Sequence, residues 1–267
     1  MNQHYRKYSL DYFLECQHRI GFESVELWCG SPHFWIDPQG YDDCSAIRKK
    51  AAARGISIVS VTVPSFLWQY QCAAESGLRA EQSFRYFSNG IHAASELQCK
   101  IMTVNSGWGI QTEPKQEAWK RAKDFLARLC DVAQHEGVIL ALEALRNDES
   151  NIVNDITSTK RMFDEIGHPS LKVMVDTIAM GAAGESLNDW FDVFGRDLAH
   201  SHFLDGDPHV HNIWGDGNYP LEDMLQTMND RGYEGLLVQE VADERYFDDP
   251  ALADERNMAV LERFIED

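Results

Sequence analysis

Three things are missing from this 267-residue sequence. No apolar run approaches the roughly 20 residues that a membrane-spanning helix needs, and the first residues lack the charged and then apolar pattern of a secretory signal. The six cysteines are irregularly spaced without a C-x-x-C pair, which favours neither a disulfide framework nor a zinc knuckle. These absences predict a cytoplasmic protein.

Basic residues are scarce as well. The chain has 24 lysines and arginines against 43 aspartates and glutamates, for a formal net charge of -19. So acidic a chain repels phosphate backbones and anionic membranes, and we expect neither nucleic acid nor a membrane as partner. A barrel endonuclease acting on abasic sites would also need a basic groove and more histidines for a multi-metal cluster, so this class is disfavoured.

What the sequence does contain is a regular alternation of short apolar strands and amphipathic helices. Strands are predicted at 24–28 and 56–63, and five more end at Asn105, Glu143, Asp176, His202 and Glu240. Helices are predicted at 8–20, 42–54, 79–98, 116–136, 157–166, 186–197, 221–231 and 250–265. Strands this short and apolar are typical of a parallel sheet covered on both faces. With no linker or repeat in view, we predict one α/β domain over 1–267, a (β/α)₈ TIM barrel.

Four side chains of metal-binding type stand at the ends of four consecutive predicted strands. Their separations of 33, 26 and 38 positions are those between Glu143, Asp176, His202 and Glu240. A barrel of about 250 residues allots roughly 31 to each strand–helix unit, and its active site lies at the carboxyl ends of its strands. An open doubly wound sheet also places its site at strand carboxyl ends, so the spacing alone leaves that architecture open.

One imidazole and three carboxylates form a mostly oxygen donor set, which suits Mn²⁺, Mg²⁺ or Co²⁺ better than a thiolate-selecting metal. Without a cation, carboxylates 4 Å apart repel by about 4 kcal/mol per pair at an effective dielectric of 20. Any single acidic strand end could instead cap a helix or pair with a loop cation. All four together predict a divalent-metal site.

The eighth strand of the barrel, which should come first, has no counterpart in the sequence. A predicted helix at 8–20 precedes the strand at 24–28, so the missing strand would end near residues 1–3. Either the chain start is missing, for example through a misassigned initiation codon, or residues 1–7 form only a stub. An unpaired sheet edge is an aggregation liability, so we expect reduced stability or an edge that a partner chain covers.

Several motifs together carry a specific resemblance. They are Glu26-Leu-Trp-Cys-Gly-Ser-Pro-His33, Glu149-Ser-Asn-Ile-Val153, Met174-Val-Asp176, His200-Ser-His202 and Asp230-Arg-Gly-Tyr-Glu-Gly235, the last leading into Glu240. From about residue 2 to its end, the chain resembles the xylose isomerase-like family of sugar epimerases and isomerases. Within it, the chain is similar to the fructoselysine and D-tagatose 3-epimerase branches. The resemblance implies that the chain once began with a strand.

The resemblance also implies roles for individual residues. One divalent metal, often Mn²⁺ and alternatively Mg²⁺, Co²⁺, Ni²⁺ or Zn²⁺, is held in the family by the residues that match Glu143, Asp176, His202 and Glu240. The two glutamates also serve as the proton-transfer bases. Glu149, six residues past the first ligand, matches a glutamate that contacts the sugar, and His211 matches a histidine of the fructoselysine 3-epimerase branch.

Two departures from the family pattern bear on the substrate. The D-tagatose branch has a substrate-binding histidine where this chain has Ala179, and an arginine where it has Pro208. We therefore expect a substituted, fructoselysine-like ketose more than a free ketohexose.

The chemistry expected of such a site is proton transfer at the carbon beside a ketone, which becomes acidic when a cation binds the developing enediolate oxygen. If a metal chelates the C2 carbonyl and C3 hydroxyl of the sugar, Glu143 and Glu240 can flank opposite faces of C3. One would remove the C3 proton and the other would deliver a proton from behind. We therefore predict a 3-epimerase that acts through a metal-stabilised enediolate.

Aromatic and histidine side chains near strand ends are further candidate substrate contacts. Trp28, Trp68 and Trp108 lie at or just past strand ends, and His33 follows the first strand. Contact with a sugar and ordinary local packing are the two interpretations of each. His200 shares a strand face with His202, and we expect it to support that ligand or to sit in the core.

Other activities can use the same ligands. An aldose–ketose isomerase or a sugar dehydratase on this metal site is one alternative, and a truncated barrel without catalysis is another. We expect a small-molecule sugar as the substrate and a homo-oligomer as the assembly.

Overall fold

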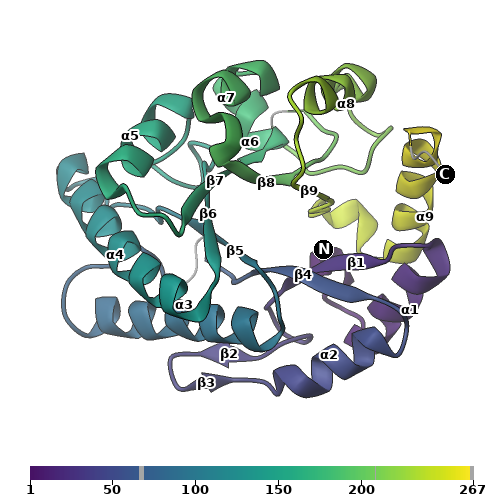
Figure 1. Ribbon diagram of the computed structural model, residues 1–267, viewed down its shortest axis with the longest axis horizontal. Coiled ribbons are helices and arrows are strands. Elements are labelled where there is room, and N and C mark those ends of the chain that lie inside the picture. The colour runs from purple at the N-terminus through teal and green to yellow at the C-terminus, as the bar shows by residue number, and fades with distance from the viewer. Residues whose placement is uncertain (66–68, 208, 265–267) are drawn as a thin grey trace.

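The computed structural model describes residues 1–65, 69–207 and 209–264, so Trp68 and Pro208 lie outside the described residues. Its centre is a ring of parallel strands with helices around the outside (Figure 1). The strands, in their order around the ring, are β1 (Ser24–Trp28), β4 (Ser57–Thr62), β5 (Ile101–Asn105), β6 (Ile139–Glu143), β7 (Leu171–Asp176), β8 (Leu198–His202) and β9 (Leu236–Val238). The predicted barrel with a reduced first strand is confirmed.

The helices fall where the apolar periodicity places them, with ends that differ by a few residues. They are α1 (Leu10–Ile20), α2 (Cys44–Ala52), α3 (Leu78–Glu96), α4 (Lys115–Glu136), α5 (Ile156–Ile166), α7 (Leu187–Phe194), α8 (Leu221–Asp230) and α9 (Pro250–Leu261). The described residues also form four short 3-10 helices: η1 (Gln3–Tyr5), η2 (Gly195–Asp197), η3 (Glu244–Tyr246) and η4 (Glu262–Phe264). Among the described helices, none is long and apolar enough to cross a membrane.

Two elements escaped the sequence prediction because they are too short to show a period. One is α6 (Thr177–Ala183), which begins directly after β7. The other is the antiparallel hairpin of β2 (Ile36–Asp37) and β3 (Gly40–Tyr41), which packs near α3 through a hydrogen bond from the Asn89 amide to the Asp37 carbonyl oxygen at 2.8 Å.

The ring remains open between β9 and β1, and the first residues of the chain lie at this opening (Figure 1). There the chain forms the 3-10 helix η1 (Gln3–Tyr5) and no strand. The Met1 ammonium donates to the Gln239 carbonyl oxygen at 2.9 Å, and the Asn2 side chain bonds both the N–H and the carbonyl oxygen of Trp28. Residues 1–2 therefore bridge the two edges of the sheet. We call residues 1–7 the stub. We call the opening between β9 and β1 the seam.

A buried carboxylate ties the elements around the seam together. Asp254 of α9 accepts hydrogen bonds from the Tyr5 hydroxyl at 2.8 Å and the Gln17 amide of α1 at 2.6 Å. Its other oxygen lies 2.9 Å from His4 Nε2. Burial by itself raises the pKa of Asp254, but His4 and Tyr5 outweigh it and hold the pKa below its usual value. The seam is thus closed by satisfied polar contacts and not by a strand.

The register of the sheet decides which polar side chains share a level inside the barrel. Asn105 is paired with Glu143, and Asp176 with His202, at the carboxyl ends of their strands. Because side chains alternate along a strand, the residue two positions earlier faces the lumen one layer deeper, as His200 does below His202. The strand ends therefore assemble one polar layer above another.

Candidate metal centre and active-site cavity

The four predicted ligands meet at one point of the barrel mouth. Each of them offers one donor atom, and these atoms all lie within 4.8 Å of one another; the set is Glu143, Asp176, His202 and Glu240. The first three are the last residues of β6, β7 and β8, and Glu240 follows β9 by two positions. Parallel strands in register bring their carboxyl ends to the same rim, which is why positions so far apart in the sequence converge.

His202 Nδ1 is the atom around which the carboxylates gather. It lies 2.7 Å from Glu240 Oε2, 3.0 Å from Glu143 Oε1 and 3.8 Å from Asp176 Oδ2. The atom is fully buried, yet within the part of the chain that the structure describes it makes no hydrogen bond of acceptable geometry. A buried nitrogen without a hydrogen bond, facing three carboxylates, fits a divalent cation with oxygen-rich ligands.

Asp176 combines the two roles that a strand-end acid can have. Its Oδ1 accepts hydrogen bonds from the N–H groups of Ile178 and Ala179 at 2.6 and 2.9 Å and so caps the N-terminus of α6. Its Oδ2 faces His202 Nδ1 and lies 3.4 Å from His211 Nε2. The capping bonds fix the carboxylate in the plane that presents Oδ2 to the site.

The surroundings shift the pKa values of Glu143 and Asp176 in opposite directions. Burial raises the pKa of Glu143 to about 7, and the neighbouring carboxylates of Glu240 and Asp176 add to the effect while His202 opposes it. Burial also acts to raise the pKa of Asp176, but His211, His202 and the α6 amides outweigh it and lower the pKa. A cation between the acids would relieve the repulsion that Glu143 otherwise avoids by keeping its proton.

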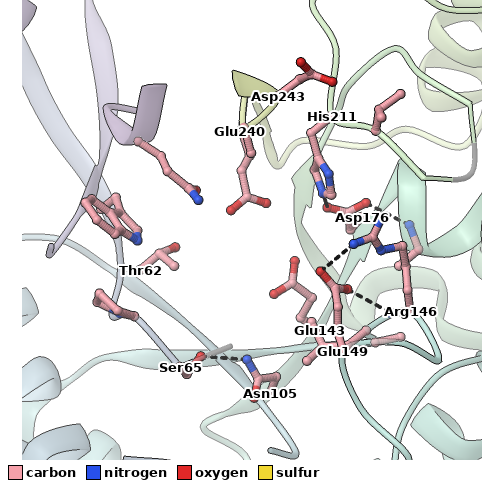
Figure 2. A pocket seen from close by; sticks show the side chains of 18 of the residues that line it. Thr62, Ser65, Asn105, Glu143, Arg146, Glu149, Asp176, His211, Glu240 and Asp243 are labelled. Carbon is pink, nitrogen blue, oxygen red and sulfur yellow. Dashed lines mark hydrogen bonds and ion pairs between the residues drawn. The ribbon is translucent and has the colours of Figure 1, made fainter. Parts of the chain in front are cut away.

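A cavity of about 450 Å³ opens over this centre. Figure 2 shows Glu143, Asp176 and Glu240 directed into it, with His211 beside Asp176. Of the predicted substrate contacts, Trp28, Glu149 and His211 line the cavity. This volume is in the range of small-molecule sites, which are commonly 300–1,000 Å³.

Glu149 is held in place by its neighbour Arg146. The Arg146 guanidinium donates to Glu149 Oε1 at 3.1 Å, and the Arg146 backbone N–H donates to Oε2 at 3.0 Å (Figure 2). Burial raises the pKa of Glu149 despite this ion pair. Both side chains border the cavity, so the pair can present a fixed carboxylate to a ligand.

Two of the predicted substrate contacts lie outside this cavity. His33 is buried, with Nδ1 2.7 Å from the Asn2 amide of the stub and Nε2 2.9 Å from the Tyr8 carbonyl oxygen, so both ring nitrogens have a partner. Trp108 borders a different cavity, of about 500 Å³, together with Gln71 and Arg121. The structure thus places His33 and Trp108 away from the cavity that opens over the candidate metal centre.

Several polar residues of the cavity were not expected from the sequence. They are Gln3, Thr62, Asn105, Arg146 and Asp243. Asn105 ends a predicted strand, so its position at the rim was available as a signal. Gln3 comes from the stub and Asp243 from an acidic run that resembles a solvated surface, and neither carries a local signal of this position.

Comparison with known proteins agrees with the architecture. A family model described as xylose isomerase-like TIM barrel matches residues 16–264. Fructoselysine 3-epimerase of Shigella flexneri is 27% identical over 92% of this chain and 88% of its own length. D-psicose 3-epimerase of Ruminiclostridium cellulolyticum is 23% identical over 86% of this chain and 77% of its own. A solved D-psicose 3-epimerase with D-tagatose, from Clostridium cellulolyticum H10, superposes with a TM-score of 0.80 at 19% identity, covering 98% of this chain and 96% of that one.

Proposed function

Because the chain belongs to the xylose isomerase-like TIM barrel family, we propose that it is a divalent-metal-dependent enzyme that inverts C3 of a ketose. Fructoselysine-like substituted ketoses are the proposed substrate class, and Mn²⁺ is the proposed ion. The observation that carries the proposal is the position of Glu143 and Glu240, whose carboxylates face the same cavity from separate strands on either side of His202.

The two glutamates divide the proton transfer between them. With the sugar in the cavity, one carboxylate takes the C3 proton from one face, and the other returns a proton to the opposite face of the resulting enediolate. In the metal-free chain, burial raises the pKa of Glu143 to about 7, and a bound cation would lower that pKa again and favour the carboxylate form that accepts the C3 proton. A divalent cation held by Glu143, Asp176, His202 and Glu240 supplies the positive charge that makes the C3 proton acidic.

The other lining residues orient the sugar. Glu149, fixed by Arg146, accepts hydrogen bonds from sugar hydroxyls, and His211, in contact with Asp176, donates to or accepts from a sugar oxygen. Trp28 offers an apolar wall for a sugar ring or chain.

The charge of the cavity supports a substituent on the sugar that carries an amine. Five carboxylates are among its described lining residues: Glu143, Glu149, Asp176, Glu240 and Asp243. The cationic groups there are Arg146 and His211. Burial acts to lower the pKa of His211, but the Asp176 carboxylate outweighs it and raises the pKa to about 9. A bound divalent ion leaves this lining negative, which favours a cationic ligand over a neutral one. Ala179, without a polar side chain, leaves its part of the wall free for such a substituent.

The proposal is tested by proton exchange in deuterated water. The Mn²⁺-loaded protein is incubated with fructoselysine and with a panel of free ketoses, and deuterium at C3 and the epimer ratio are followed by NMR. We expect exchange at C3, fastest with the substituted ketose. Glu143→Gln and Glu240→Gln should each lower its rate by about 10²- to 10⁴-fold, the usual contribution of a positioned acid or base.

Glu117→Gln, on an exposed position of α4, is the matched control and should keep the full rate. Metal content is measured for every variant, because both glutamates are also ligands. Exchange that persists in both site variants would contradict their assignment as bases. Formation of an aldose would favour an isomerase, loss of water a dehydratase, and no exchange with any sugar a barrel without catalysis.

A further inference from the structure

One buried carboxylate below the metal centre takes no part in the proposed proton transfer. Glu26 of β1 is 1% exposed and lies inside the barrel. Four polar hydrogens converge on it, from His200 Nε2 at 2.8 Å, His202 Nε2 at 3.0 Å, the Ser60 hydroxyl at 2.6 Å and the Thr62 hydroxyl at 2.8 Å. Each of its oxygens receives one imidazole and one hydroxyl, so the carboxylate is fully satisfied.

The arrangement leaves no place for a second cation at this carboxylate, although Glu26, His200 and His202 offer a plausible set of ligand types. A carboxylate can only accept, so each Nε2 that it contacts must carry a hydrogen. Its lone pairs are therefore occupied by hydrogen bonds. The consequence for His202 is that Nε2 is protonated and the other ring nitrogen, Nδ1, is the one that faces Glu143 and Glu240.

We propose that Glu26 is a positioning residue for the metal centre. By holding Nε2–H of His202, it fixes the tautomer and the ring orientation that direct the Nδ1 lone pair to the cation. The inference rests on the metal site of the proposed function but not on its sugar chemistry. It also connects one edge of the seam, β1, to the site, because Glu26 belongs to β1 and its partners to β8 and β4.

Among the hydrogen bonds and ion pairs of the described residues, no contact other than that with Glu26 distinguishes the two orientations of the His202 ring. Its other ion-pair partners are the carboxylates that share the metal, and these would accept a hydrogen from Nδ1 as readily as from Nε2. Without Glu26, we expect the His202 ring to direct an N–H toward those carboxylates. This hydrogen would then compete with the cation for their oxygens. Removing a hydrogen-bond partner of a ligating histidine typically lowers metal affinity about 10- to 100-fold.

The first test uses the unmodified protein. The chain is labelled with ¹⁵N at its histidines, loaded with Zn²⁺ as a diamagnetic divalent ion, and examined by long-range ¹H–¹⁵N correlation. The His202 signals are assigned by their loss in His202→Gln. We expect a protonated Nε2 and an unprotonated Nδ1 on His202. A protonated Nδ1, with Nε2 as the ligand, would overturn the proposal whatever any variant shows.

The second test measures Mn²⁺ affinity by calorimetry, without sugar. Glu26→Leu removes the acceptor and should weaken binding about 10- to 100-fold. Glu26→Gln keeps one oxygen that can still accept from His202 Nε2, so its loss should be smaller, below about 10-fold. Equal losses in the two variants would contradict an orienting hydrogen bond, and an unchanged affinity in Glu26→Leu would refute the proposal.

Asp254→Asn is the matched control for general destabilisation. It also alters a fully buried carboxylate that several donors contact, but its partners His4, Tyr5 and Gln17 make no contact with the metal-site acids among the described hydrogen bonds and ion pairs. It should lower thermal stability and leave Mn²⁺ affinity unchanged. A failure of sugar turnover with normal Glu26 results would count against the proposed function alone.

Discussion

Two groups of buried carboxylates in this barrel have opposite surroundings. At the seam, Asp254 contacts three side chains that can donate a hydrogen to it, and its pKa is lowered although it is buried. At the barrel mouth, Glu143 faces Asp176, Glu240 and one imidazole, and its pKa is raised to about 7. The same kind of side chain is therefore satisfied by protein donors at the seam, whereas at the barrel mouth its surroundings suit a cation.

The largest effect is expected from breaking the seam side of this comparison. Asp254→Asn removes the charge that Tyr5 and Gln17 donate to and leaves an amide hydrogen facing a donor. We expect the free energy of unfolding to fall by about 3 kcal/mol, which lowers the midpoint of thermal unfolding by roughly 6–12 °C at 2–4 °C per kcal/mol. A midpoint within experimental error of the unmodified protein would show that the stub and α9 contribute little.

The metal side is tested by adding or removing the ion. A cation that binds only the folded chain stabilises it by about 2.7 kcal/mol at a concentration 100 times its dissociation constant. Thermal unfolding is compared in Mn²⁺ and in excess chelator, for the unmodified chain and for Asp176→Ala. We expect Mn²⁺ to raise the midpoint of the first and not of the second. An equal rise in both would place the stabilising ion elsewhere.

The sharpest contrast between the two sides is the pH dependence of the metal-free protein. The folded pKa of Glu143 lies near 7, above its ordinary value of 4.5, so between these two values the folded chain holds a proton that the unfolded chain has lost. Stability of the metal-free protein should therefore fall as the pH rises across this window. Asp254 has the opposite sign, because its lowered pKa gives stability that is present above about pH 3.8 and is lost as the pH falls further.

Urea unfolding of the chelator-treated protein between pH 4.5 and 7 measures the first of these slopes. Glu143→Gln cannot titrate and should flatten it, whereas Asp254→Asn should leave it in place and flatten the decline below pH 3.8. If Glu143→Gln retains the slope of the unmodified chain, another group is responsible.

Much of the fold follows from the local pattern of the chain. Short apolar runs identify the seven strands, because a strand buried on both faces is apolar along its length. Apolar residues with a period of 3.6 identify the longer helices, because each buries one face. The convergence of the candidate metal ligands was predictable for a related reason. Strand carboxyl ends of a parallel barrel share one rim, so Glu143, Asp176 and His202 had to converge once the strands were placed.

The sequence by itself determined the alternation of strands and helices, the reduced first strand and the four residues at the strand ends, because each depends on spacing along one strand or from one strand to the next. That spacing left an open sheet possible, and the tertiary structure decided for the nearly closed ring. Only the tertiary structure decided that His33 bonds the stub, that Trp108 borders another cavity, and that Glu26 accepts a hydrogen bond from His202. These relations join side chains from distant elements across the lumen and the seam. They depend on ring orientation and hydrogen-bond geometry, and neither produces a regular spacing of residues in the sequence.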